Sequence, residues 1–157
     1  MILFHGSNCV VSAPDIYHSR ACVDFGKGFY ATPIHSQAQK WCERYLRIGE
    51  AGIISRYIFD DNAMENLSVL RFDSYSEEWL DFIASCRTGH DSSRYDIVIG
   101  GVANDRVFDT IELYFDGLIK KQEAISRLRY QQPDLQICFR TQNAIEQYLH
   151  FEGSESL

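Results

Sequence analysis

The fold is decided by the stretch Asp24-Phe25-Gly26-Lys27-Gly28-Phe29-Tyr30-Ala31-Thr32, which lies downstream of Leu3-Phe4-His5-Gly6-Ser7. Glycine carries no side chain, so each glycine lets the backbone approach a ligand closely. In the first stretch the segment Gly26-Lys27-Gly28 is followed directly by the aromatic residues Phe29 and Tyr30, and in the second a His-Gly pair closes an apolar run. A flat heteroaromatic ring can be held by backbone groups at one edge and an aromatic face. The two segments therefore predict a binding site.

Length and composition predict a single domain. The chain has 157 residues, of which 45% are hydrophobic and 24% are charged, and its net charge is -7. These values are ordinary for one soluble globular domain, which we expect at residues 1–151, with 152–157 as a frayed tail. An acidic chain gains little from counterion release, so bulk binding of nucleic acid is disfavoured.

The sequence also predicts where the protein works. No apolar run reaches the ~20 residues that span a bilayer, and the N-terminus lacks a signal-length apolar segment. Five scattered cysteines without a paired spacing argue against a disulfide framework and a zinc site. We therefore expect a cytoplasmic protein that does not contact a membrane.

The hydrophobic pattern predicts short strands that alternate irregularly with helices, which is typical of an α+β domain. A helix is expected to begin at Thr32 as N-cap and to end at Gly49, and Ser76 and Thr141 are expected to cap two others. The predicted strands are 2–4, 29–31, 53–59, 95–99 and 136–140, and two further helices are expected at 105–115 and 118–130.

Each of the two segments, taken alone, can be explained by local structure without a ligand. A histidine at a strand end, such as His5, often meets a backbone carbonyl, and many loops need a glycine. The spacing Gly26-x-Gly28 is too short for a dinucleotide fingerprint or a phosphate-binding loop. The combination of the two segments in one chain is more informative than either segment by itself.

Asn104 and Asp105 follow a glycine pair at the end of a predicted strand. Loops that leave strand ends often carry functional residues, so both residues are secondary candidates for ligand binding. Asp105 has an alternative interpretation as the N-cap of the next helix. The five histidines are dispersed and lack the spacing of metal ligands, so no metal site is expected.

The segments Leu3–Ser7 and Phe25–Cys42 resemble two segments of the ADP-ribosyltransferase superfamily, in its poly(ADP-ribose) polymerase and diphtheria-toxin-like branch. In that branch a His-Gly-Ser segment precedes a Phe-Gly-Lys-Gly-aromatic-Tyr segment, and a helix with an inward aromatic follows. The whole chain is similar to a family of uncharacterised small bacterial proteins assigned to the superfamily, through Asp24–Tyr30, Tyr95–Val98, Gly101–Asp105 and Gln136–Phe139. The resemblance implies an ADP-ribosyltransferase-like fold, with two small, mostly antiparallel sheets around an NAD cleft and flanking helices.

The resemblance also implies roles for single residues. His5 would hydrogen-bond a ribose hydroxyl of NAD, Gly6 would hold the nicotinamide carboxamide through its backbone, and Tyr30 would stack on the ring. Trp41 falls where the polymerases place a second stacking aromatic, and core packing is its alternative. Where the polymerases have a carboxamide-binding serine, this chain has Ala38. The resemblance adds three further residues that would line the NAD site: Ser7, Gly28 and Phe29.

Gln136 occupies the place of the superfamily's glutamate, so His5, Tyr30 and Gln136 form the implied catalytic set. An amide can hold a ribose hydroxyl but supplies no negative charge opposite a developing cation. Losing one such electrostatic group commonly costs on the order of a hundredfold in rate. Gln136 also has an alternative interpretation as a polar residue of an edge strand. If Gln136 does take the place of the glutamate, three outcomes are open. Catalysis is slower, the site binds without reacting, or another carboxylate takes over the role, such as Asp96, Asp105 or Glu146.

The activity implied by the resemblance is that of an NAD-dependent transferase of the glycosyltransferase class, with NAD as co-substrate. The acceptor of ADP-ribose is open: a protein side chain, a nucleic-acid base or water. In bacteria such an enzyme would suit a toxin or effector with a neutralising partner protein, as in toxin–antitoxin pairs. The alternative from another class is a module that binds NAD, ADP-ribose or a protein without turnover.

Overall fold

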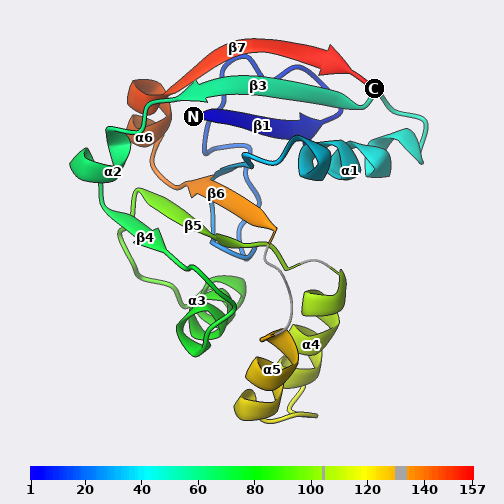
Figure 1. The fold of residues 1–157 in the computed structure, drawn as a ribbon, viewed down its shortest axis with the longest axis vertical. Helices are drawn as coiled ribbons and strands as arrows, with labels where there is room; N and C mark the ends of the chain where they lie inside the picture. Colours follow the sequence, from blue (N-terminus) through cyan, green and yellow to red (C-terminus); the bar gives the residue numbers. More distant parts are fainter. Residues whose placement is uncertain (104, 130–133) are drawn as a thin grey trace.

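The computed structural model describes residues 1–103, 105–129 and 134–157 (Figure 1). Strands and helices alternate without a regular rhythm, as the sequence pattern predicts. In chain order the described elements are β1 (Ile2–Ser7), β2 (Phe29–Ala31), α1 (His35–Leu46), β3 (Ile53–Phe59), α2 (Ala63–Asn66), β4 (Val69–Arg71), α3 (Glu77–Arg87), β5 (Ile97–Gly101), α4 (Asp105–Phe115), α5 (Lys121–Leu128), β6 (Leu135–Phe139), α6 (Gln142–Tyr148) and β7 (Leu149–Ser156).

The strands form two small sheets, and the fold is therefore α+β with mostly antiparallel pairing. Sheet A has the order β1-β3-β7, and both of its strand pairs are antiparallel. Sheet B has the order β2-β6-β5-β4, in which only β4 and β5 run parallel. Figure 1 shows sheet A above sheet B, with β7 at the top of the molecule. The expectation of two small sheets with flanking helices is confirmed at this level.

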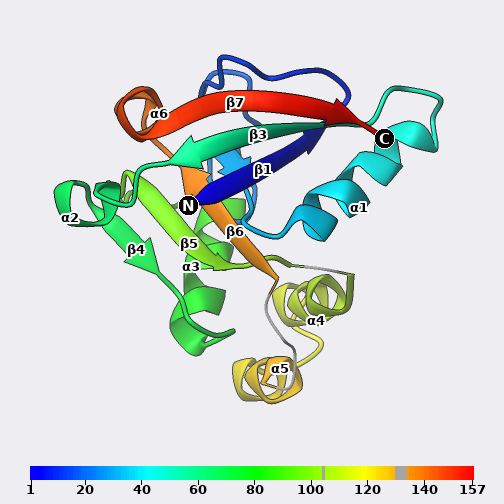
Figure 2. The ribbon, with the colours of Figure 1, turned by 45° about the horizontal axis from the view of Figure 1, so that its top comes forward.

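The two sheets and the helices form successive layers. The inner face of sheet A packs on one face of sheet B, where Leu3 and Tyr57 meet Phe29 and Phe139 in one buried cluster. The other face of sheet B packs on α3, α4 and α5 through a second cluster that includes Trp79. In Figure 2, α1 lies beside sheet A and α3, α4 and α5 lie at the far side of sheet B. Apolar side chains cover both faces of sheet B, and its central strand β5 is accordingly buried throughout.

The C-terminal residues differ from the expectation of a frayed tail at 152–157. Residues up to Ser156 belong to β7, which pairs along β3 from Phe59 to Ile53. The sequence here is polar and exposed, so the hydrophobic pattern gives no sign of a strand. Backbone hydrogen bonds to β3 hold the segment, and these do not depend on apolar side chains.

The predicted start of α1 at Thr32 is also wrong. The helix begins at His35, with Ile34 in the N-cap position and no side-chain cap. Thr32 instead exchanges backbone hydrogen bonds with Phe4 in an isolated bridge between the two sheets. The other two expected caps are confirmed: Ser76 accepts from Trp79 N–H, and Thr141 accepts from Ala144 N–H.

Among the described residues, no helix is long and apolar enough to cross a bilayer.

Candidate functional site

The two motif segments meet at a seam between β1 and the end of β2. The N–H of Phe4 donates to the carbonyl of Thr32 at 2.8 Å, and the N–H of Thr32 donates to the carbonyl of Phe4 at 2.9 Å. This antiparallel bridge is isolated, so the strands pair at one step and then diverge. If the pairing continued by one more step, Gly6 would lie opposite Tyr30.

The divergence leaves backbone groups of Gly6 without a strand partner. Residues of β1 direct their N–H and C=O alternately to the two edges of the strand. Phe4 uses the outer edge, toward Thr32, so Gly6 directs its N–H and C=O to that same edge. Among the described residues, the outer edge of β1 is bridged only at Phe4. Unpaired backbone groups at a buried residue are rare and costly, which makes this edge a candidate for binding a ligand.

Gly6 is also fixed by its contact with α1. A Cβ at this position would lie 2.4 Å from the carbonyl oxygen of Ala38 and 2.9 Å from Sγ of Cys42. Such distances are well inside van der Waals contact, so only glycine lets α1 pack this closely on β1. The helix is thereby held directly beside the divergent edge.

His5 lies at the seam and contacts β2 through its ring. Its Nδ1 is 2.7 Å from the carbonyl oxygen of Tyr30, and its ring centroid is 4.6 Å from that of Phe29. Because a carbonyl only accepts, Nδ1 carries the proton and Nε2 is left as an acceptor. Burial lowers the pKa of His5, and the hydrogen bond to Tyr30 opposes this only in part. A neutral imidazole with a free acceptor nitrogen is suited to receive a hydroxyl hydrogen bond.

The Tyr30 phenol is anchored in the loop that contains Gly26 and Gly28, which we call the glycine loop. Its hydroxyl donates to the carbonyl of Gly26 at 2.6 Å and accepts from the N–H of Phe25 at 3.0 Å. Burial raises the pKa of Tyr30 far above its ordinary value, so the hydroxyl stays protonated. The side chain is partly exposed, and its ring orientation is fixed by the two hydrogen bonds.

The His5 imidazole and the Tyr30 phenol lie on opposite faces of β2. Successive residues of a strand point to opposite faces, so Phe29 and Tyr30 do so as well. The imidazole packs on Phe29, in the layer between the sheets, whereas Tyr30 packs in the cluster of α3 and α4. The structure thus brings His5 to the backbone of Tyr30, not to its ring.

Trp41 is not part of the core. Its side chain is 44% exposed on α1, and the guanidinium of Arg44 lies 3.7 Å from the centre of its ring. The interpretation of Trp41 as a core residue is therefore wrong. An exposed indole with one face under a cation leaves the other face for contact with a ligand or partner.

Gln136 lies on the same face of sheet B as Tyr30. Tyr30 pairs with Cys138, and Gln136 is two residues before Cys138 on β6, so the three side chains share a face. The residue is buried, and its Nε2 lies 3.5 Å from the carbonyl oxygen of Gly101. At this distance the hydrogen bond is weak, and the amide is held mainly by packing.

Asp96 and Glu146, two of the candidates to replace the superfamily's glutamate, make other hydrogen bonds. Asp96 accepts from the N–H of Ser68 and from the hydroxyl of Thr141, which engages both of its oxygens in holding chain turns. Glu146 lies exposed on α6 and accepts from Gln142. Asp105 is the first residue of α4, shortly after β5, and Asn104 lies outside the described residues.

The remaining predicted binding residues serve the local structure. Ser7 donates from its hydroxyl to the carbonyl of Cys9 at 2.5 Å, within its own loop. A Cβ on Gly28 would lie 2.5 Å from Sγ of Cys138, so glycine is required for the loop to pack on β6. Phe29 is buried and packs edge-on against Tyr57.

The glycine loop is tied to α3 and to the loop after β5 by Asp24. One carboxylate oxygen of Asp24 accepts from Nη2 and Nε of Arg87 at 2.6 and 3.0 Å. The other oxygen accepts from the N–H of Ala103 at 3.3 Å. Both side chains of the ion pair are only 16% exposed. We call Asp24, Arg87 and Ala103 the Asp24 junction. Asp24 belongs to the sequence motif, but the sequence gives no sign that Arg87 and Ala103 are its partners.

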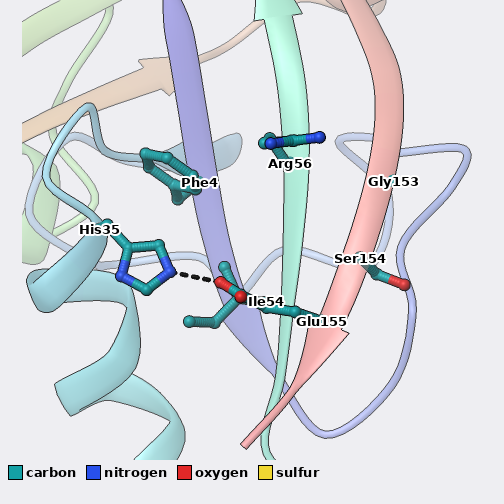
Figure 3. Close-up of a pocket in the computed structure, with 7 residues that line it drawn as sticks. All are labelled: Phe4, His35, Ile54, Arg56, Gly153, Ser154 and Glu155. Atoms are coloured by element: carbon teal, nitrogen blue, oxygen red, sulfur yellow. Dashed lines mark hydrogen bonds and ion pairs between the residues drawn. The ribbon is translucent and has the colours of Figure 1, made fainter.

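A groove of about 480 Å³ lies on the outer face of sheet A, between the first turn of α1 and β7 (Figure 3). His35 contacts Glu155 across it through Nε2, and Phe4, Ile54 and Arg56 lie along it. A smaller cavity of about 160 Å³ lies behind the glycine loop, beside the ion pair of Arg140 with Asp91 and the thiols of Cys22 and Cys86. The predicted site residues His5, Gly6, Tyr30 and Gln136 line neither of the two.

Comparison with known proteins assigns the chain to a family. Residues 1–151 match a family described as proteins of unknown function (DUF3990), and the chain belongs to that family. No curated protein and no solved structure matches it significantly. The match covers every element up to the first residues of β7.

Proposed function

We propose that this protein is an ADP-ribosyltransferase-like enzyme that binds NAD where β1 and β2 diverge. It cleaves the bond between nicotinamide and ribose and transfers ADP-ribose to an acceptor. The observation that carries the proposal is the outer edge of β1 at Gly6, which no described strand pairs with, beside His5, whose ring contacts the carbonyl of Tyr30. A carboxamide can pair with an N–H and a C=O of one residue much as a neighbouring strand does.

In the proposed complex Gly6 donates its N–H to the carboxamide oxygen and accepts a carboxamide N–H. The Nε2 of His5 accepts a ribose hydroxyl, in keeping with its protonated Nδ1 and lowered pKa. Tyr30 offers a ring whose orientation is fixed by the glycine loop. These groups hold the glycosidic bond in place, and positioning of this kind accounts for a large part of many rate enhancements.

In the reaction the bond from ribose C1′ to the pyridinium nitrogen breaks, and both electrons go to nitrogen, which releases neutral nicotinamide. The acceptor forms the new bond to C1′ with its lone pair and loses a proton. Gln136 can hold a ribose hydroxyl, but its amide adds no negative charge beside the cationic centre. The acceptor is a protein, a nucleic acid or water, and the net charge of -7 disfavours bulk nucleic acid. Action as a bacterial toxin with a neutralising partner would suit such an enzyme.

The second candidate is a module that binds NAD or ADP-ribose without turnover. Two observations favour it: a neutral amide at Gln136, and an imidazole and a phenol on opposite faces of β2. A site with these features can recognise a ligand without stabilising a transition state. Binding and release of nicotinamide must therefore be measured separately.

The test is incubation of the purified protein with NAD, followed by chromatography of released nicotinamide and by NMR detection of NAD binding. For an enzyme we expect release that falls at least about tenfold in His5→Ala and Tyr30→Ala. Tyr17→Ala is the matched control, since Tyr17 is 70% exposed and is not one of the proposed site residues. Circular dichroism of each variant reports whether it is folded.

Gln136→Glu separates the two candidates further. A carboxylate at this position supplies the missing charge, so release should rise on the order of a hundredfold if the rest of the site is competent. Saturable NAD binding with no release in either protein supports the binding module. The absence of both binding and release overturns both candidates.

A further inference from the structure

Two cysteines from distant parts of the chain line the small cavity behind the glycine loop. Cys22 precedes Gly26 in that loop, and Cys86 lies in the last turn of α3. The cavity has a volume of only about 160 Å³, so both side chains border the same confined space. The pair lies apart from the seam between β1 and β2.

The glycine loop and the end of α3 are held side by side. A Cβ on Gly26 would lie 3.7 Å from Sγ of Cys86, and a Cβ on Gly89 would lie 3.8 Å from Sγ of Cys22. The ion pair of the Asp24 junction joins the same two segments at 2.6 Å. Each sulfur therefore reaches the backbone of the opposite segment, across a boundary that the ion pair already fixes.

The two thiols differ in their access to solvent. Cys22 is exposed, whereas Cys86 is only 3% exposed and borders the cavity. Burial, with the carboxylate of Asp91 nearby, raises the pKa of Cys86 to about 12. An oxidant from solution therefore meets Cys22 first, and Cys86 stays a protected thiol until a reactive sulfur is formed beside it.

The backbone at Cys22 has an uncommon conformation. Its φ is 58°, and no other non-glycine residue in the described part of the chain has a positive φ. A side chain is crowded in this left-handed region, which glycine and asparagine adopt more readily. The fold nevertheless keeps a cysteine there with its sulfur close to Gly89. Strained positions of this kind cluster at functional sites.

The other three cysteines do not line this cavity. Cys9 is exposed in the loop after β1, and Cys42 is buried under α1 beside Ile54. Cys138 is fully buried on β6, where a Cβ on Gly28 would lie 2.5 Å from its sulfur. The lining residues of the cavity include Cys22 and Cys86 and none of these three.

We propose that Cys22 and Cys86 are a modification site, at which hydrogen peroxide forms a reversible disulfide that clamps the glycine loop onto α3. First the Cys22 thiolate attacks one oxygen of peroxide and the O–O bond breaks, which gives a sulfenic acid and hydroxide. The sulfur of Cys86, as it loses its proton, then attacks the sulfur of Cys22 and the S–O bond breaks. Overall two thiols are oxidised, one peroxide is reduced and two water molecules form.

The clamp acts on the loop that orients Tyr30. The phenol of Tyr30 is hydrogen-bonded to backbone groups of Phe25 and Gly26, shortly after Cys22 in the chain. An ion pair such as that of Asp24 opens and closes freely, whereas a disulfide opens only on reduction. The inference goes beyond the proposed function and does not rest on it.

The test treats the purified protein with a small excess of hydrogen peroxide, blocks the remaining thiols with iodoacetamide and maps the unreduced peptides by mass spectrometry. We expect a linked peptide pair that contains Cys22 and Cys86, in a protein that is lighter by two hydrogen atoms. Dithiothreitol should restore both thiols. Before reduction, trypsin should cut the oxidised protein more slowly at Lys27, which is exposed in the clamped loop.

The variants assign the order of the two steps. Cys22→Ser should prevent the disulfide and leave Cys86 reduced at the same dose. Cys86→Ser should also prevent it, and the sulfenic acid on Cys22 should then be trapped by dimedone. Cys9→Ser is the matched control, because it removes an exposed thiol outside the cavity and should leave the disulfide unchanged. If Cys86→Ser fails to fold, Cys86→Ala removes the thiol without burying a hydroxyl.

The outcomes that overturn the proposal are distinct. A disulfide that joins Cys22 or Cys86 to any other cysteine, in the same chain or in a second copy, overturns it. So does a wild type in which both thiols still react with iodoacetamide after a dose that oxidises Cys9. Cleavage at Lys27 that is equally fast before and after oxidation overturns the clamp. None of these measurements involves NAD, so their failure leaves the proposed function untouched.

Discussion

The seam between β1 and β2 and the Asp24 junction both join segments that are distant in sequence, yet they treat polar groups in opposite ways. At the junction both oxygens of Asp24 are engaged, by Arg87 and by the N–H of Ala103. At the seam the pairing stops after Phe4, and among the described residues no strand pairs with the outer edge of β1 at Gly6. A junction whose polar groups are all hydrogen-bonded supports the fold. A seam with backbone groups that lack a strand partner offers hydrogen bonds to a ligand.

The first prediction tests the junction and has the largest expected effect on stability. Asp24→Ala leaves the largely buried Arg87 guanidinium without its main partner and frees the N–H of Ala103. We expect a loss of about 2–3 kcal/mol in the free energy of unfolding by urea. Asp73→Ala, which removes the exposed partner of Arg71, should cost less than about 0.5 kcal/mol. Equal costs for the two variants would remove the distinction between the junction and a surface ion pair.

The second prediction tests the seam. In Gly6→Ala the new methyl group meets the backbone of Ala38 at 2.4 Å, so α1 must move away from β1. We expect a loss of about 2 kcal/mol in stability and the loss of measurable nicotinamide binding. Gly153→Ala is the control, because a Cβ there meets nothing within 4 Å. Nicotinamide binding that survives Gly6→Ala unchanged would show that the ligand does not use this edge.

The third prediction concerns the protonation of His5 and is the smallest. The pKa of His5 is lowered in the folded protein, so between that pKa and about 6.5 the unfolded chain binds more protons. Stability from this group therefore rises with pH through that window and is constant above it. Each unit by which the pKa is lowered corresponds to about 1.4 kcal/mol.

The measurement is the free energy of unfolding as a function of pH for the wild type and for His5→Asn. The difference between the two curves should decrease toward lower pH only below about 6.5, because asparagine does not titrate. A constant difference across the whole range would mean that the imidazole has the same pKa in the folded and unfolded chains.

Much of the architecture could be predicted from local pattern. The strands at 29–31 and 53–59 and the cap at Ser76 follow from β-branched and aromatic runs and from capping chemistry, and the structure has them. The strand at 149–156 was missed, since its residues from Glu152 onward are mostly polar and its pairing with β3 joins segments that are far apart in the sequence. The start of α1 was missed because Thr32 is used by a bridge to Phe4, a contact across the chain.

The candidate site also has some features that the sequence predicts and others that depend on tertiary contacts. Its residue types, a His-Gly pair and a glycine loop with a tyrosine, are visible in the sequence. The roles of Gly28 and Phe29 in packing on β6 and Tyr57 depend on contacts between distant segments.

By itself, the sequence determined the α+β class, the order of most elements and the two segments that meet at the seam, because propensity, periodicity and capping act over a few residues. The tertiary structure alone decided that β1 and β2 separate after one bridge and that His5 and Tyr30 fall on opposite faces of β2. Those features depend on strand register and on the direction from which α1 packs on β1. Both are set by contacts between residues far apart in the chain.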